Sequence, residues 1–297
     1  MTASDATGTR ATGPTPPAEE ADRPFRRVLV AVELSPAAES FVRDLRWLQT
    51  LGTTDLVLVH VLQAGELDPE MCHARLRALG SYLRGDGFEV QQKIGTGHPS
   101  KEIARIAADT GASVIVVGSK SRREGHTGHV ALEVIRRSEV PVLLVRTRDA
   151  PPDAPAMDPL ALDAPAHPVP ERVLFATDFS EAAQRAFSWT EKLVTLGVRR
   201  FDLLHARPPE GTKKKVEADR ELRRLAERLS QAGAEELNPR VSPVEAARAI
   251  MVAADDDPLP LVVMGTHGRG FLSRALMGSV AREVARKVDA PLLLVPD

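Results

Sequence analysis

Three glycines follow a short apolar run late in the chain, in an order that could bind an anion. The run at residues 262–264 ends at Gly265, and Gly268 and Gly270 follow shortly after it. A Val-rich run that is too short for a helix is typical of a buried strand. Glycines directly after a strand let the backbone turn tightly and approach a ligand closely, because they have no Cβ. The pattern therefore predicts a strand followed by a loop that can come close to a ligand.

A helical pattern begins at the end of this loop. Gly278 and Ser279 precede apolar residues at the spacing of one helix face, namely Val280, Ala281, Val284, Ala285 and Val288. A strand, a glycine loop and a helix start can together surround an anion with free backbone N–H groups and the positive end of the helix dipole. Ser279 adds a hydroxyl there. The alternative interpretation is a glycine-rich turn in which Ser279 is an ordinary helix N-cap.

The spacing of these residues resembles a family signature. Gly265-x2-Gly268-x9-Gly278-Ser279 is similar to the nucleotide-binding motif of the universal stress protein family, in its ATP-binding branch. The flanking segments at residues 266–270 and 291–295 resemble the same family. The resemblance implies that the four motif residues hold the ribose and phosphates of ATP, with Mg²⁺ bridging the phosphates.

The composition limits the kind of protein. A chain of 297 residues is long enough for about two domains, and 43% hydrophobic with 27% charged residues is ordinary for a soluble globular protein. The net charge of −2 gives no basic field that would favour nucleic acid or an anionic membrane. The single cysteine, Cys72, is expected to be a buried small residue. No apolar run approaches the ~18 residues of a membrane span and no secretion signal opens the sequence, so we expect a cytoplasmic protein.

Strand and helix patterns alternate along two long segments, residues 25–148 and 171–297. Residues 1–24 are rich in Thr, Ala and Pro and predict a disordered tail. Residues 149–170 are rich in Pro and Ala and predict an extended linker. Apolar strands that alternate with helices indicate a parallel sheet covered by helices on both faces. In the first segment, Ser35-Pro36 predicts the start of a helix that runs to Gly52.

The second segment repeats the first with a period of about 145 residues, which indicates a duplicated domain and not a solenoid. The strand at residues 28–32 has its echo at 173–177, the strand at 141–145 has its echo at 291–295, and His60 corresponds to His205. The resemblance thus covers both segments and implies a tandem universal stress protein. Its fold class would be α/β, with two doubly wound domains, each a five-stranded parallel sheet of strand order 3-2-1-4-5 with helices on both faces.

The resemblance also implies how the strands at the edge associate. The final strand, residues 292–295, is apolar and would lie at an edge where family members pair. In a tandem chain, the two halves could pair there as an intrachain pseudo-dimer. A homodimer and an unknown protein partner also stay open.

Ligands of open α/β sheets bind beyond the carboxyl ends of strands, where the strand order reverses. In the second domain, the two strands at this place would end at Asp178 and Gly265. The resemblance implies that Asp178 contacts the nucleoside end of ATP. The alternative for Asp178 is a helix-capping acid near Ser180. Thr177, beside it, is either part of the site or a plain strand residue.

The first domain departs from the motif. Glu33 replaces the acid with a side chain one methylene longer, Ser121 stands where the motif has a glycine, and His129 stands where Ser279 would be. A side chain at residue 121 would block the approach of a phosphate to the backbone. We therefore predict that this domain does not bind ATP in the family's manner. Lys120, Arg122 and Arg123 could still attract an anion or could form a solvated loop.

The function expected from these observations is ATP binding that acts in a stress response through occupancy of one site. No catalytic base, nucleophile or Walker-type Gly-Lys-Ser sequence can be placed. Two alternatives remain: a slow ATPase or ATP-dependent transferase on the same scaffold, and a nucleotide-free interaction module. Mixed charges over residues 213–228 predict a solvated helix face, not a nucleic-acid stripe. Neither the residues 255–257 nor the pair His126 and His129 is expected to bind a metal.

Overall fold

The computed structural model describes residues 23–34, 41–42, 44–63, 68–120, 128–147, 171–206, 212–256, 258, 260–268 and 277–297. The predicted linker and all but the last two residues of the predicted tail lie outside these ranges. So do several residues that the sequence singled out: Ser35, Pro36, Ser121, Arg122, Arg123, His126, Asp257 and Gly270.

The strands of each half form the predicted parallel sheet. The first half contains β1 (Arg27–Ala31), β2 (Asp55–Leu62), β3 (Glu89–Thr96), β4 (Val114–Lys120) and β5 (Val142–Thr147). The second half contains β6 (Arg172–Ala176), β7 (Arg200–Ala206), β8 (Glu236–Ser242), β9 (Leu261–Gly265) and β10 (Leu292–Val295). The orders β3-β2-β1-β4-β5 and β8-β7-β6-β9-β10 confirm the 3-2-1-4-5 arrangement expected in each domain.

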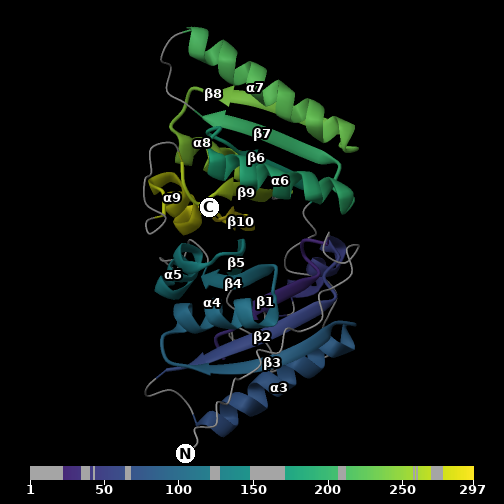
Figure 1. Ribbon diagram of the computed structural model, residues 1–297, viewed down its shortest axis with the longest axis vertical. Coiled ribbons are helices and arrows are strands. Elements are labelled where there is room, and N and C mark those ends of the chain that lie inside the picture. The colour runs from purple at the N-terminus through teal and green to yellow at the C-terminus, as the bar shows by residue number, and fades with distance from the viewer. Residues whose placement is uncertain are drawn as a thin grey trace, which may run out of the picture.

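An antiparallel pair, β5 with β10, joins the two halves into one 10-stranded sheet (Figure 1). Leu143 lies opposite Leu293, and Leu144 lies opposite Leu292. Each of these strands is the edge of its own half, so their pairing uses backbone N–H and C=O groups that an open edge would leave exposed. The final strand is therefore an edge only within its own domain. In the whole chain it is an inner strand, and the two halves are paired within the chain.

Helices cover both faces of this sheet. One hydrophobic cluster packs under η1 (Asp44–Leu51), α3 (Pro69–Gly85), α6 (Glu181–Thr195) and α7 (Thr212–Gln231). A second cluster packs under α4 (Pro99–Thr110), α5 (His129–Arg137), α8 (Ala246–Ala254) and α9 (Ser279–Lys287). Successive strand residues alternate between the clusters: Val28 and Val30 belong to the first and Leu29 to the second. This is the two-sided burial that the continuous apolar runs predicted. Cys72 is buried in the first cluster, as expected.

The first helix of the chain differs from the prediction. Where the sequence predicted a helix as far as Gly52, the described part is mainly the 3₁₀ helix η1, which ends at Leu51 before Gly52 at φ 77°. The buried leucines Leu45, Leu48 and Leu51 are spaced by three residues. That interval suits the three residues per turn of a 3₁₀ helix.

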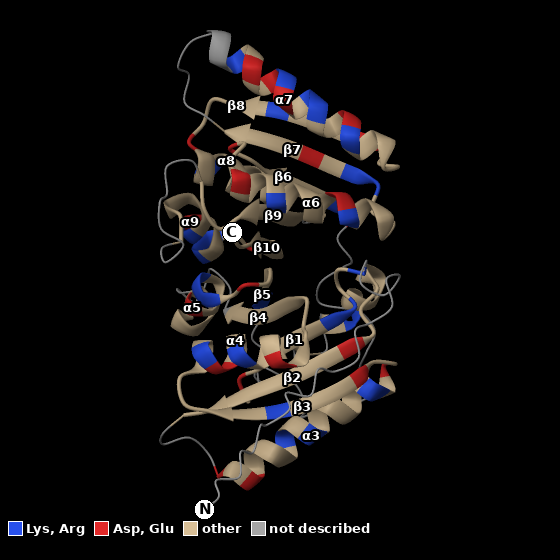
Figure 2. Cartoon of the chain, viewed as in Figure 1, with Lys and Arg blue, Asp and Glu red and all other residues tan. Residues whose placement is uncertain are grey.

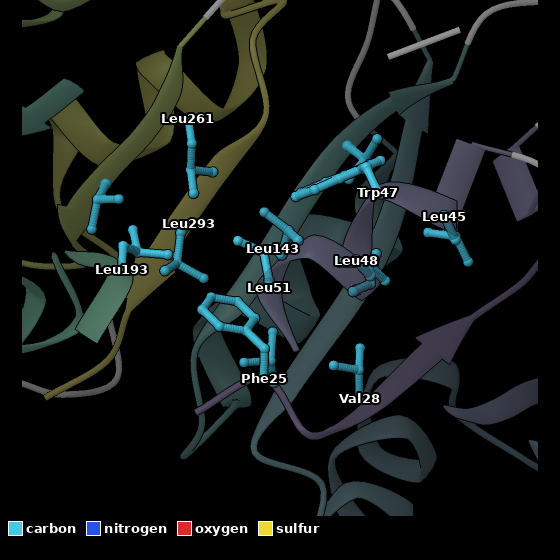
Figure 3. Packing of buried hydrophobic residues seen from close by; sticks show 14 of the residues in the cluster. Phe25, Val28, Leu45, Trp47, Leu48, Leu51, Leu143, Leu193, Leu261 and Leu293 are labelled. Atoms are coloured by element: carbon cyan, nitrogen blue, oxygen red, sulfur yellow. The ribbon is translucent and has the colours of Figure 1, made fainter. Parts of the chain in front are cut away.

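The first cluster runs without a break across the junction of the two halves (Figure 3). Phe25, which is fully buried, belongs to the first half, and Trp189 on α6 belongs to the second. Their ring centroids lie 5.5 Å apart at an interplanar angle of 85°, an edge-to-face contact. Leu143 and Leu293 belong to the same cluster. The two domains thus share one core face.

Charged residues on α7 alternate in sign along the helix (Figure 2). Arg223 pairs with Asp219 at 2.8 Å, Arg224 with Glu221 at 2.6 Å, and Arg228 with Glu191 of α6 at 2.9 Å. These ion pairs agree with the solvated face of mixed charge that the sequence predicted. Among the described helices, none has the length and apolar character that crossing a membrane requires.

The contact between Phe25 and Trp189 generates a first prediction. Phe25→Ala should lower the free energy of unfolding of the full chain by about 3–5 kcal/mol, because it empties a fully buried site at the junction of the halves. Urea denaturation followed by circular dichroism measures this. Val252→Ala, at a side chain that is 66% exposed, is the control and should change stability by less than about 0.5 kcal/mol. A loss in Phe25→Ala no larger than that of the control would show that the junction does not depend on this ring.

Candidate functional site

Two neighbouring strands bring the predicted acid and the first motif glycine to one edge of the sheet. β6 pairs with β7 on one side and with β9 on the other, so the strand order reverses here. Phe175 of β6 lies opposite Val263 of β9. Thr177 and Gly265 each follow that pair by two positions, and Asp178 comes next. This is the place in an open parallel sheet where ligands bind.

The turn after β6 is held in an unusual conformation. Phe179 has φ 60°, in the left-handed region that residues other than glycine rarely adopt. The buried Thr177 supports the turn, because its Oγ1 accepts a hydrogen bond from the Phe179 N–H at 2.9 Å. The Thr177 carbonyl lies 2.8 Å from Nδ1 of the buried His205, whose ring packs on Phe179 at 4.6 Å between centroids. Thr177 is therefore a structural support of the turn as well as part of the cavity wall.

His205 has the same role as its counterpart in the first half. His60 Nδ1 lies 2.9 Å from the Val32 carbonyl, also directly after the first strand of its domain. Both histidines are 6% exposed. The sequence echo of the two histidines thus marks a duplicated buried hydrogen bond that anchors the end of the first strand.

Asp178 contacts the start of α6 with one carboxylate oxygen. Its Oδ1 accepts a hydrogen bond from the Ser180 N–H at 3.0 Å. Ser180 itself is the N-cap of α6, with its hydroxyl accepting from the Ala183 N–H at 3.2 Å. This contact agrees with the alternative interpretation of Asp178 as a helix-capping acid. Its second oxygen, Oδ2, faces Gly268: a Cβ at Gly268 would lie 2.7 Å from it.

The motif glycines Gly265 and Gly278 lack room for a Cβ for different structural reasons. A Cβ at Gly265 would lie 3.0 Å from the carbonyl carbon and from the Cβ of Ala182, so this glycine lets α6 pack closely on β9. A Cβ at Gly278 would lie 3.2 Å from the Thr266 carbonyl oxygen, which also accepts the Gly278 N–H at 2.9 Å. Gly278 thus closes the ends of the glycine loop, whose residues 269–276 lie outside the described ranges.

The start of α9 lies at the same place. Gly278 is the N-cap, with φ −58° and ψ 149°, and as a glycine it gives the first turn no side-chain cap. Ser279 is the first helical residue and is exposed, so the alternative in which Ser279 is the N-cap is wrong. Backbone N–H groups in the first turn of a helix have no partner within the helix. With the helix dipole, they form a place that favours an anion.

All six residues predicted for the site line one cavity of about 240 Å³. Thr177 and Asp178 follow β6, whereas Gly265, Gly268, Gly278 and Ser279 lie on the segment from the end of β9 to the start of α9. The remaining wall is formed mainly by small or apolar side chains that the sequence analysis did not identify, namely Ala176, Ala183, Leu204, Ala206, Ala246, Ile250, Met264 and Ala281. The sequence feature that could have identified this wall is the set of alanines at strand ends and helix starts. They leave room where larger residues would fill the cavity.

His267 lies within the glycine loop and in the wall of the cavity. Its Nδ1 is 2.9 Å from the Thr266 hydroxyl and 3.3 Å from Oδ2 of Asp297. Arg185 of α6 donates to the other oxygen of that carboxylate at 2.7 Å. These contacts hold the first part of the glycine loop against β10 and α6. Among the described residues, no group of three acidic, histidine or cysteine side chains could hold a metal ion.

The first half has a cavity at the equivalent place, of about 490 Å³. Glu33, Gly118, Gly128 and His129 are in its wall, and both Glu33 and His129 are exposed. A Cβ at Gly128 would meet no atom within 4 Å, whereas one at Gly278 would press on Thr266. The starts of α5 and α9 therefore differ in how tightly they are built against the sheet.

The packing of Gly265 generates a second prediction. Gly265→Ala should lower the free energy of unfolding by about 1–3 kcal/mol, because its Cβ would overlap the backbone of α6. Thermal unfolding or urea denaturation measures the loss. Gly128→Ala is the matched control, since its Cβ would meet no described atom within 4 Å, and it should cost only the preference for glycine over alanine at an N-cap, about 0.5 kcal/mol. Equal stability of the two variants would contradict the close approach of α6 to β9.

Comparison with known proteins agrees with the duplicated architecture. The Universal stress protein family model matches residues 24–146 and 170–296. A universal stress protein from Methanocaldococcus jannaschii is 23% identical over 158 residues, which cover 42% of this chain and 98% of that protein. One from Mycobacterium tuberculosis is 30% identical over 194 residues, which cover 62% of this chain and 61% of its own length.

A solved structure resembles the whole chain. The crystal structure of a universal stress protein from Archaeoglobus fulgidus has a TM-score of 0.72 with 19% identity, covering 92% of this chain and 98% of its own. That likeness concerns the fold. Since the family model matches both halves, the chain belongs to the universal stress protein family, with two such domains in tandem.

Proposed function

We propose that the second domain binds ATP and that its occupancy acts in a stress response. The observation that carries this proposal is that Asp178, the three described motif glycines and the start of α9 line one cavity. The carboxylate would bind the nucleoside end, and the first-turn N–H groups of α9 would bind phosphate oxygens. The enclosed volume of about 240 Å³ is just below the usual range of ~300–1,000 Å³ for ligand sites, so the nucleoside would fill it and the phosphates would extend along the loop.

The residues present fit a nucleotide that carries its own cation. Mg²⁺ is commonly held by substrate phosphates and waters with one or two carboxylates. In this proposal Mg²⁺ would be bound by the triphosphate. The charge of the phosphates would then be shared between the metal, the α9 amides and the Ser279 hydroxyl.

We further propose that the first domain does not bind ATP in this way. Its cavity has Glu33 and His129 where the second domain has Asp178 and Ser279. The longer carboxylate would reach into the space of the nucleoside, and the imidazole would stand in front of the first-turn amides of α5. One ATP for each chain is therefore expected. Saturation at 100 times the dissociation constant would stabilise the chain by about 2.7 kcal/mol, enough to couple the ATP level to its persistence.

The stoichiometry and the loop can be tested together, which is a third prediction. Titration calorimetry of the full chain with MgATP should give one equivalent. Gly278→Asp should weaken binding more than about 100-fold, because it places a negative charge beside the phosphates. Gly128→Asp, at the N-cap of α5, is the matched control and should leave the affinity unchanged.

Each other outcome of that titration has a definite meaning. Two equivalents would overturn the claim for the first domain. No binding by the parent chain, or full affinity in Gly278→Asp, would overturn the proposed site. Mass analysis of the released nucleotide distinguishes occupancy from chemistry, since accumulation of ADP over time would replace a binding function with a slow ATPase.

The different surroundings of the two Asp178 carboxylate oxygens give a fourth prediction. Asp178→Asn can keep the hydrogen bond from the Ser180 N–H with its amide oxygen, but it removes the charge and leaves an N–H₂ donor where Oδ2 was. The free energy of unfolding should change by less than about 0.5 kcal/mol. The affinities for ATP and for adenosine should both fall about tenfold or more, the usual size for a lost hydrogen bond to a charged group. Unchanged affinity for both ligands would mean that Asp178 serves only the start of α6.

A further inference from the structure

A buried guanidinium connects the two halves of the chain. Arg146, on β5 of the first half, is 3% exposed. Its Nε donates to the Val288 carbonyl at 2.6 Å and its Nη2 to the Ala285 carbonyl at 2.9 Å, both in the second half. Its Nη1 donates to the Ser119 hydroxyl at 2.9 Å, within the first half. One side chain thus bonds both to the end of β4 in the first half and to two backbone carbonyls of the second half.

The two acceptors in the second half belong to the carboxyl end of α9. Ala285 is in its last turn, and Val288 is its C-cap. Carbonyls at this end have no partner within the helix and carry the negative end of the helix dipole. Burial lowers the pKa of Arg146 from its ordinary value, and the nearby charge of Asp289 opposes this effect. An arginine in such a place still keeps its proton at neutral pH, so the helix end contacts a cation.

The same helix lines the candidate site with its other end. Gly278 and Ser279, at the start of α9, are in the wall of the cavity, and the Gly278 N–H is bonded to the Thr266 carbonyl. α9 has nine residues, and a helix so short is not stable by itself in water. Its position therefore depends on its buried face, which packs in the second cluster, and on what holds its two ends. One end is bonded to the Thr266 carbonyl and the other to Arg146.

The contact is not repeated in the opposite direction. α5 and α9 have the same length and lie in equivalent places beside the pair β5–β10 (Figure 1). The segment at residues 141–145 is echoed by 291–295, so the position equivalent to Arg146 is Pro296. Proline carries no side-chain donor. A cationic side chain of the first half thus contacts the carboxyl end of α9, whereas the equivalent position of the second half has no cationic side chain for α5. The helix that receives the cation is the one in the domain with the complete glycine spacing.

We propose that Arg146 is a positioning residue for the phosphate-binding end of α9, so that the first domain holds part of the second domain's site in place. This rests on the proposed ATP function. Without the guanidinium, the Ala285 and Val288 carbonyls would lose these charged donors, and α9 would shift along its axis. Its first-turn N–H groups would then no longer meet the phosphates, while the nucleoside end at Asp178 would be unaffected.

The test is a comparison of ligands with and without phosphate, the fifth prediction. In the full chain, Arg146→Gln should raise the dissociation constant of MgATP about tenfold, within the range that a cation at a helix carboxyl end supplies. The dissociation constant of adenosine should change less than about twofold, since adenosine has no phosphate for α9 to bind. Arg146→Lys keeps the charge but loses the forked geometry, and it should restore part of the ATP affinity.

A purely structural arginine gives the control. Arg46 on η1 donates to both carboxylate oxygens of Asp86 at 2.8 and 2.5 Å, remote from the cavity of the second half. Arg46→Gln should reduce stability without changing the ratio of ATP to adenosine affinity. An unchanged ATP affinity in Arg146→Gln, or an equal loss for both ligands, would overturn the proposal.

A second measurement does not require a nucleotide. Hydrogen exchange of the ligand-free chain should be faster at the α9 amides of Arg146→Gln than in the parent, with α5 unchanged as the internal reference. If the parent binds no ATP, the proposed function fails while this result still shows whether Arg146 holds α9. If α9 exchanges at the same rate in both chains, the positioning role is wrong whether or not ATP binds.

Discussion

The antiparallel contact between β5 and β10 is the constraint on which the rest of the molecule depends. Each strand would be an exposed edge of its own five-stranded sheet, with unpaired backbone groups along it. Their pairing, with Leu143 opposite Leu293, turns two sheets into one and lets each core face continue across the junction. It also places α5 beside α9. The contacts of Phe25 with Trp189 and of Arg146 with α9 lie on either side of this strand pair.

Packing and ligand binding make separate demands on the same glycine loop. A Cβ at Gly265 would press on α6, and a Cβ at Gly278 would press on the Thr266 carbonyl oxygen. These glycines are thus needed by the protein even before any ligand arrives. Gly268 differs, since the atom that its Cβ would meet is Oδ2 of the Asp178 carboxylate. A glycine that leaves room beside a charged side chain in a cavity is best understood through a ligand.

Much of the fold could be predicted from the sequence, since apolar runs and glycine spacing are local patterns. The strand order came from the family resemblance, and the structure confirms it. The 3₁₀ form of η1 was missed because leucines at intervals of three also satisfy one face of an α-helix. Arg146 was missed for a different reason. Its acceptors lie 139 and 142 residues away, and no pattern along the chain indicates a contact that exists only once the two halves have paired.

The pairing of the halves gives the first domain a structural role whether or not its own cavity binds a ligand. A sheet that ends at β10 would expose a backbone edge and the apolar side of Leu293, and the shared core would lose Phe25. The second domain therefore needs a partner surface of this shape even if the partner binds nothing. Once that surface is guaranteed by a covalent link, residues in the first cavity are free to change. Residues at the junction are not, because a change there alters the support of α9. If the junction is constrained and the first cavity is not, a difference such as that between Arg146 and its counterpart Pro296 is expected.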